Sequence, residues 1–132
     1  MPLTSDEVQH LLSALGVVES QENPKAVGDQ GAAIGQFQMQ PIAYQDIQRV
    51  DPSYRTIPYD RLKTDPAFQR QAAQRYLEMG QNTYGITDLD RLISFYNAGP
   101  KARRGALINP EYVRKVKRQM GNPTLRSFHA SP

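Results

Sequence analysis

The chain has 132 residues, 39% of them hydrophobic and 22% charged, with a formal net charge of +3, and these values fit one compact domain. It contains no cysteine, which excludes a disulfide framework and a thiolate zinc site. Its two histidines, His10 and His129, lie at opposite ends of the sequence, so we expect neither a histidine metal centre nor a cofactor. No apolar run approaches the roughly 20 residues that a membrane-spanning helix needs.

The first element in chain order is a predicted helix over residues 4–20. Thr4 and Glu7 have the spacing of a capping box, in which each side chain accepts from the other residue's backbone N–H. Apolar residues then recur at helical spacing, namely Val8, Leu11, Leu12, Leu15 and Val18. Proline and several glycines interrupt this pattern over residues 23–40, which predicts a glycine-rich turn or a short β-hairpin.

Four further helices are predicted, and three of them have a proline at or near the first position. They begin at Pro41, at Asp65-Pro66, at Asp88 and at Asn109-Pro110, and we expect them to end near residues 50, 80, 99 and 121. The predicted fold is therefore a mainly α domain over residues 1–121 with a short insert after the first helix. Residues 122–132 are expected to form a loose C-terminal tail.

Positive charge is concentrated near the C-terminal end. Residues 101–132 contain eight basic residues and a single acidic residue, Glu111, whereas the first hundred residues are acidic overall. A basic segment of this kind indicates either a solvated helix face or a contact with a polyanion such as nucleic acid, an anionic bilayer or an anionic wall polymer. The residues that would make this contact are Lys101, Arg103, Arg104, Arg114, Lys115, Lys117 and Arg118.

Glu19 is the first candidate for chemistry. It continues the apolar stripe of the first helix, four positions after Leu15. A carboxyl group among apolar side chains either finds a partner or holds its proton, and a proton held at neutral pH is what a general acid needs. The spacing alone is equally compatible with a glutamate that ends the helix in water or pairs with an arginine.

Three motifs in the expected order resemble the lysozyme-like lytic transglycosylases. From Glu19 the chain reads E-S-x-x-N-P-x-A, followed by a Gly–Ala-rich turn, G-x-x-Q and Pro41. Residues 96–100 read Y-N-A-G-P, and residues 112–116 read Y-V-x-x-V. The resemblance implies an α+β lysozyme-like fold and cleavage of the β-1,4 bond between N-acetylmuramic acid and N-acetylglucosamine in peptidoglycan.

The turn departs from the common form of this family. It is one residue longer, and Gln36-Phe37-Gln38 replaces the usual L-M-Q, which is similar to a phage and bacterial branch of lysozyme-like enzymes. The longer turn places Asp29 ten residues after Glu19, where a second carboxylate would serve a hydrolase. Asp29 also suits an ordinary turn, and a lytic transglycosylase works with one acid. The resemblance therefore favours the single-acid reaction, which gives 1,6-anhydromuramic products, and hydrolysis by Glu19 with Asp29 is the alternative.

The resemblance assigns roles by matched position. Glu19 would act as both acid and base, and Tyr96 would hydrogen-bond it. Ser20 would orient the acid, while Gln38 and Asn97 would line the groove and bind sugar amides. Because the chain has no tryptophan, a tyrosine or phenylalanine must stack on sugar rings. The candidates for this stacking are Phe37, Tyr44 and Tyr112.

Two hypotheses from other classes remain. One is a basic helical module that binds nucleic acid, which would leave the motif at Glu19 without a role. The other is a catalytically inactive lysozyme-like domain with a structural or wall-docking function, for example in a virion. The start of the sequence lacks the pattern of a secretory signal, and we expect a monomer or part of a larger assembly that acts at the cell wall, phage-encoded or bacterial.

Overall fold

The computed structural model describes residues 3–20, 27–28, 33–34 and 37–121. Its helices are α1 (Ser5–Ser20), α2 (Pro41–Val50), α3 (Pro66–Asn82), α4 (Leu89–Ala98) and α5 (Pro110–Met120). All five predicted helices are therefore confirmed, and α3 runs two residues beyond its predicted end. The predicted hairpin is represented by β1 (Val27–Gly28) and β2 (Ala33–Ile34), which pair antiparallel with Val27 opposite Ile34.

The helix starts follow the local chemistry of the sequence. The capping box of α1 forms in both directions, since the Thr4 N–H donates to Glu7 Oε1 over 2.8 Å and the Glu7 N–H donates to Thr4 Oγ1 over 3.2 Å. Asp65 caps α3 by accepting from the Phe68 N–H, and Asp88 caps α4 by accepting from the Arg91 N–H.

The part of the chain that the structure describes also contains three short 3₁₀ helices that the sequence does not predict. They are η2 (Pro52–Tyr54), η3 (Tyr59–Lys63) and η4 (Pro100–Arg103). The first two pass between α2 and α3, and each buries one side chain, Tyr54 and Leu62 respectively. Each of these helices buries only one residue, so its sequence lacks the repeated spacing of apolar residues from which a helix is predicted.

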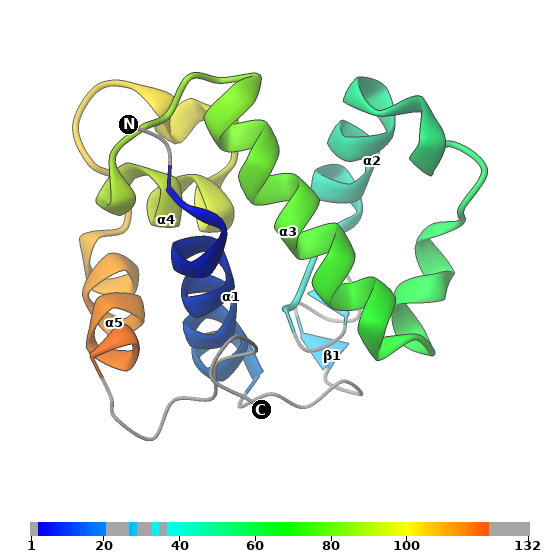
Figure 1. Ribbon diagram of the computed structural model, residues 1–132, viewed down its shortest axis with the longest axis horizontal. Helices are drawn as coiled ribbons and strands as arrows, with labels where there is room; N and C mark the ends of the chain where they lie inside the picture. The colour runs from blue at the N-terminus through cyan, green and yellow to red at the C-terminus, as the bar shows by residue number, and fades with distance from the viewer. Residues whose placement is uncertain (1–2, 21–26, 29–32, 35–36, 122–132) are drawn as a thin grey trace.

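The helices form two groups on either side of α3, which crosses the molecule diagonally (Figure 1). On one side α1 packs against α5 and α3, and α4 packs against α3 and α5; on the other side α2 packs against α3. One core continues through both groups and includes Leu11, Leu15, Ile47, Leu77 and Phe95. Among the described residues, no helix is long and apolar enough to cross a bilayer.

Gly80 sets the close approach of α3 to α4, and its replacement by Ala should destabilise the fold. An added Cβ would lie 2.7 Å from Leu92 Cδ1 and 2.9 Å from Phe95 Cδ2, inside van der Waals contact with buried side chains. Overpacking of this kind costs roughly 1–3 kcal/mol of the free energy of unfolding, measurable by denaturant titration. Gly121→Ala is the control, because its Cβ would meet nothing closer than 3.6 Å. Equal stability of the two variants would contradict this account of the α3–α4 contact.

Candidate active site

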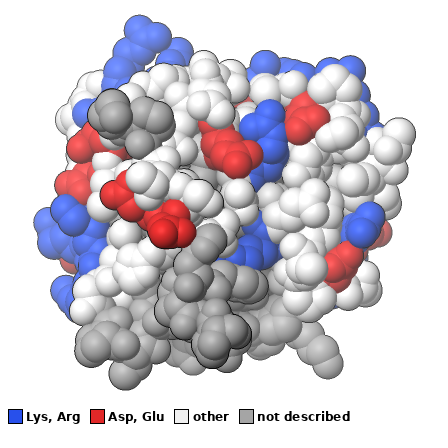
Figure 2. Space-filling view, viewed as in Figure 1, with Lys and Arg blue, Asp and Glu red and all other residues white. Residues whose placement is uncertain are grey.

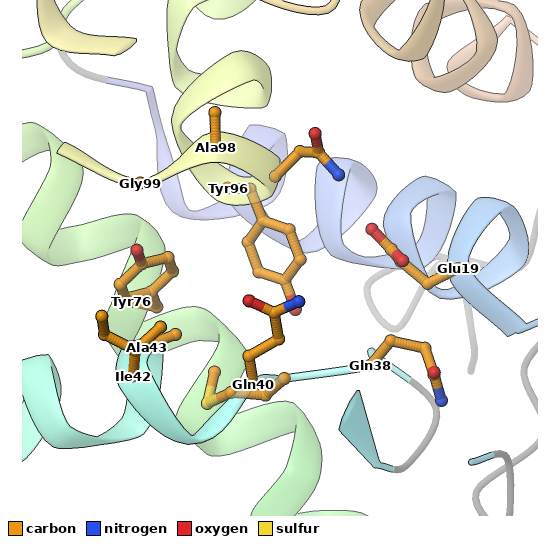
Figure 3. Close-up of a pocket in the computed structure, with 11 residues that line it drawn as sticks. Glu19, Gln38, Gln40, Ile42, Ala43, Tyr76, Tyr96, Ala98 and Gly99 are labelled. Carbon is orange, nitrogen blue, oxygen red and sulfur yellow. The ribbon is translucent and has the colours of Figure 1, made fainter. Parts of the chain in front are cut away.

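Glu19 lies in the last turn of α1 at the edge of a cavity of about 330 Å³. The cavity separates the two helix groups, with α1 and α4 on one side and the start of α2 on the other (Figure 3). Its described lining consists of Glu19, Gln38, Met39, Gln40, Ile42, Ala43, Tyr76, Tyr96, Asn97, Ala98 and Gly99. Glu19 is the one acidic residue in that described lining, so it is the carboxyl group there that can give or take a proton.

Tyr112 on α5 donates a hydrogen bond from its hydroxyl to Glu19 Oε2. Burial raises the pKa of this phenol well above its ordinary value, and the nearby Glu19 charge and the hydrogen bond itself raise it further. Tyr112 therefore stays protonated and acts as a donor to the carboxyl group. The packing of α5 on α1 brings the two residues together from positions 93 apart in the sequence.

The predicted hydrogen bond from Tyr96 to Glu19 is not the one that forms. The Tyr96 hydroxyl donates to the backbone carbonyl oxygen of Phe37 over 2.9 Å. Tyr96 nevertheless lines the cavity from α4, and Figure 3 shows its ring between Glu19 and Tyr76. Burial and then the Glu19 charge raise its pKa well above 10, so this phenol also keeps its proton.

Two of the expected sugar-stacking residues lie in the core instead. The Phe37 and Tyr44 side chains are each 1% exposed, so neither offers a face to a ligand. Tyr44 packs against other rings, among them Tyr54 and Phe68, and donates its hydroxyl to the Ile57 carbonyl. Both residues are wrong as sugar contacts, because large aromatic side chains between helices are also what fills a core.

The remaining predicted positions divide between the cavity and other places. Gln38 lies in the cavity wall with a left-handed backbone, φ 50°, which is unusual for a residue other than glycine. Asn97 lies there too, and its Oδ1 accepts from Asn109 Nδ2. Ser20 Oγ donates to the Gly16 carbonyl of its own helix. Asp29 lies outside the described residues.

Sequence reasoning missed most of the wall opposite Glu19. Gln40, Ile42 and Ala43 come from the start of α2, and Tyr76 comes from α3. Ile42 is 72% exposed, which is unusual for a large apolar residue and marks a surface available to a ligand. The one signal in the sequence was the position of Ile42 directly after Pro41, in the first turn of a helix, where an apolar residue need not face the core.

The described residues contain no cluster of three or more His, Asp or Glu side chains that could hold a metal ion. The basic residues that the structure describes between positions 101 and 118 are exposed, and Arg114 pairs with Glu111 while Lys117 pairs with Asp90. On the face seen in Figure 2, Lys and Arg side chains gather at the margin over α5, with acidic side chains beside them.

Comparison with known proteins gives the class. A family model described as the Transglycosylase SLT domain matches residues 4–118, which include α1 to α4, all but the last two residues of α5, and all the described cavity residues. The chain belongs to this family, so it is a mainly α, lysozyme-like lytic transglycosylase domain, and its general substrate is peptidoglycan. The comparisons with curated proteins and with solved structures gave no match.

Proposed function

We propose that the chain cleaves the β-1,4 bond between N-acetylmuramic acid and N-acetylglucosamine, with Glu19 as both general acid and general base. The observation that carries this proposal is the position of Glu19 in the cavity wall, with Tyr112 donating to its carboxyl group. The family match supports the same substrate independently of that geometry.

The reaction needs one carboxyl group and no water. Protonated Glu19 gives its proton to the bridging oxygen as the bond from that oxygen to C1 of the muramic residue breaks. The resulting carboxylate then takes the proton of the 6-hydroxyl on the same sugar, and O6 bonds to C1. The products are a strand with a free 4-hydroxyl and a strand with a 1,6-anhydromuramic end, and Glu19 has recovered its proton.

Asn97 and Ile42 are proposed to hold the sugar. Because Asn97 Oδ1 accepts from Asn109, its amide nitrogen is the group that faces a ligand as a donor, which suits the carbonyl of an acetamido group. Asn109 is in turn braced by Ser94 Oγ over 2.9 Å, so the amide has a fixed orientation. Ile42 supplies an exposed apolar surface for the C–H face of a sugar ring, in place of the aromatic residues predicted from the sequence.

The alternative is hydrolysis by Glu19 together with Asp29, which requires two carboxyl groups. Asp29→Asn decides between the reactions: with Glu19 as the sole acid, at least about a tenth of the activity should remain, whereas loss of a nucleophile or base would nearly eliminate it. Mass spectrometry of the released muropeptides is the measurement. Anhydro ends from both the wild type and the variant support the proposal, and reducing ends overturn it in favour of hydrolysis.

The exposed basic residues are proposed to contact anionic wall polymers beside the active site. Arg103 and Arg104 in and after η4 are exposed, as are Lys115 and Arg118 on α5. Binding of the chain to walls before and after removal of their phosphate polymers tests this role. Tight, salt-dependent binding to DNA with no preference for polymer-bearing walls would favour the nucleic-acid alternative instead.

A further inference from the structure

A second cavity continues the groove away from Glu19. Its volume is about 390 Å³, and it shares a wall with the first, formed by Ile42, Ala43, Tyr76, Ala98 and Gly99. Beyond this shared wall the lining becomes charged, with Asp46 and Arg49 on α2. A ligand bound beside Glu19 can therefore extend directly into a compartment of different chemistry.

Arg49 is fixed at this end by two partners. Its Nη2 donates to Asp46 Oδ1 over 2.6 Å and to the Tyr84 hydroxyl over 2.8 Å, and Tyr84 donates to Asp46 Oδ2 over 2.9 Å. Burial, followed by the bond to Asp46, raises the pKa of Tyr84, which keeps this phenol protonated as a donor. The three side chains thus hold one another in a closed ring of hydrogen bonds.

The exposed charge at this end is positive. The Arg49 side chain is 61% exposed and that of Asp46 only 17%, so of these two cavity-lining groups the guanidinium is the more accessible to a ligand. Arg49 Nη1 makes no hydrogen bond to the described residues, so its two N–H groups are available to a ligand while Nε and Nη2 hold the guanidinium in place. Arg103 from η4 adds a second cation, with its Cζ 6.0 Å from the centre of the Tyr84 ring.

We propose that this second cavity binds the peptide stem of the substrate, with Arg49 donating to a stem carboxylate. The inference rests on the proposed function, because it places the stem next to the bond that Glu19 cleaves. While the muramic lactyl carboxyl is bound to the stem as an amide, the glycan backbone carries hydroxyl and acetamido groups and no charge, whereas the stem carries free carboxylates. A preorientated guanidinium is a strong partner for a carboxylate and adds little to the binding of a neutral sugar.

The test compares two substrates, both stripped of phosphate polymers: glycan strands with their stems, and strands whose stems an amidase has removed and whose freed lactyl carboxylates have then been converted to neutral amides. Arg49→Gln should raise KM about tenfold on stem-bearing strands, the loss expected for one hydrogen bond between charged groups, with kcat unchanged. On stem-free strands KM should stay the same. Lys63→Gln is the control, since Lys63 is an exposed cation on η3 whose partner is Asp60 and which lines neither cavity.

Other KM results would overturn the assignment of the second cavity to the peptide stem. An equal rise in KM on both substrates would overturn the assignment and make the cavity a sugar site, and no rise on either would overturn it as well. An effect seen only with walls that keep their phosphate polymers would assign Arg49 to those polymers and not to the stem. If the wild type cleaves neither substrate, the proposed function itself fails. Arg49→Lys keeps the positive charge and should recover part of the lower KM on stem-bearing strands. This variant therefore distinguishes the loss of charge from a disturbance of the Asp46–Tyr84 hydrogen bond.

Discussion

Replacing Glu19 by Gln should abolish cleavage of peptidoglycan while the domain remains folded. The amide has nearly the shape of the carboxyl group but has no transferable proton, so strands still bind and are not cut. Removal of a general acid costs about 10²–10⁴ in rate, and here the same group also acts as the base. Dye release from labelled peptidoglycan measures the rate, and a thermal melt monitors the fold.

The matched control is Glu78→Gln, which makes the same chemical change on α3 at a side chain that is 41% exposed and lines neither cavity. It should retain full activity. If Glu19→Gln cleaves peptidoglycan as fast as Glu78→Gln does, with the two melting curves alike, the assignment of Glu19 as the catalytic acid is wrong.

Tyr112→Phe should lower kcat roughly ten- to hundredfold, because it removes the hydroxyl that donates to Glu19 and leaves the packing of the ring in place. The change should also be visible in the pH dependence. A hydrogen bond donated to a carboxyl group favours the ionised form, so without it the limb of the pH–rate profile that reports Glu19 should move to higher pH. A residue with a purely structural role would leave that limb in place.

Tyr96→Phe provides the contrast on the neighbouring ring. The Tyr96 hydroxyl donates to the Phe37 carbonyl, so its removal leaves a buried acceptor without this donor and should cost roughly 1–3 kcal/mol of the free energy of unfolding. We expect its pH–rate profile to keep the wild-type shape. If Tyr96→Phe shifts the limb of the pH–rate profile that reports Glu19 and Tyr112→Phe does not, then Tyr96, and not Tyr112, is the residue that positions Glu19.

The helices were predictable because their signals are local. Thr4 with Glu7, Asp65 and Asp88 each act within one turn of the chain, and a residue's own neighbours decide the outcome. Glu19 was found by its spacing and by a motif, both of which also lie within one stretch of sequence. These features need no knowledge of which helices touch.

The parts that were not predicted depend on which helices pack together. The motif at Tyr112 was recognised, but its contact with Glu19 requires α5 to lie against α1, and no local pattern encodes that pairing. Residue type alone does not separate a core aromatic from one that stacks on a sugar, and Phe37 and Tyr44 are core residues. The second cavity is lined by α2 and by the segment after α4, which are far apart in the sequence. Its charged end could therefore not be predicted from any single stretch of the chain.

The packing of α5 on α1 determines when the active site can form during synthesis of the chain. A ribosome makes Glu19 early, but its hydroxyl partner is made 93 residues later. Closing so long a loop follows the synthesis of α5, and the buried Val113 and Val116 of α5 join the core in the same step. An unfinished chain therefore carries its acid without the group that positions it. On the role proposed for Tyr112, nascent chains that lack α5 are poor wall-degrading enzymes, and activity rises once α5 docks on α1.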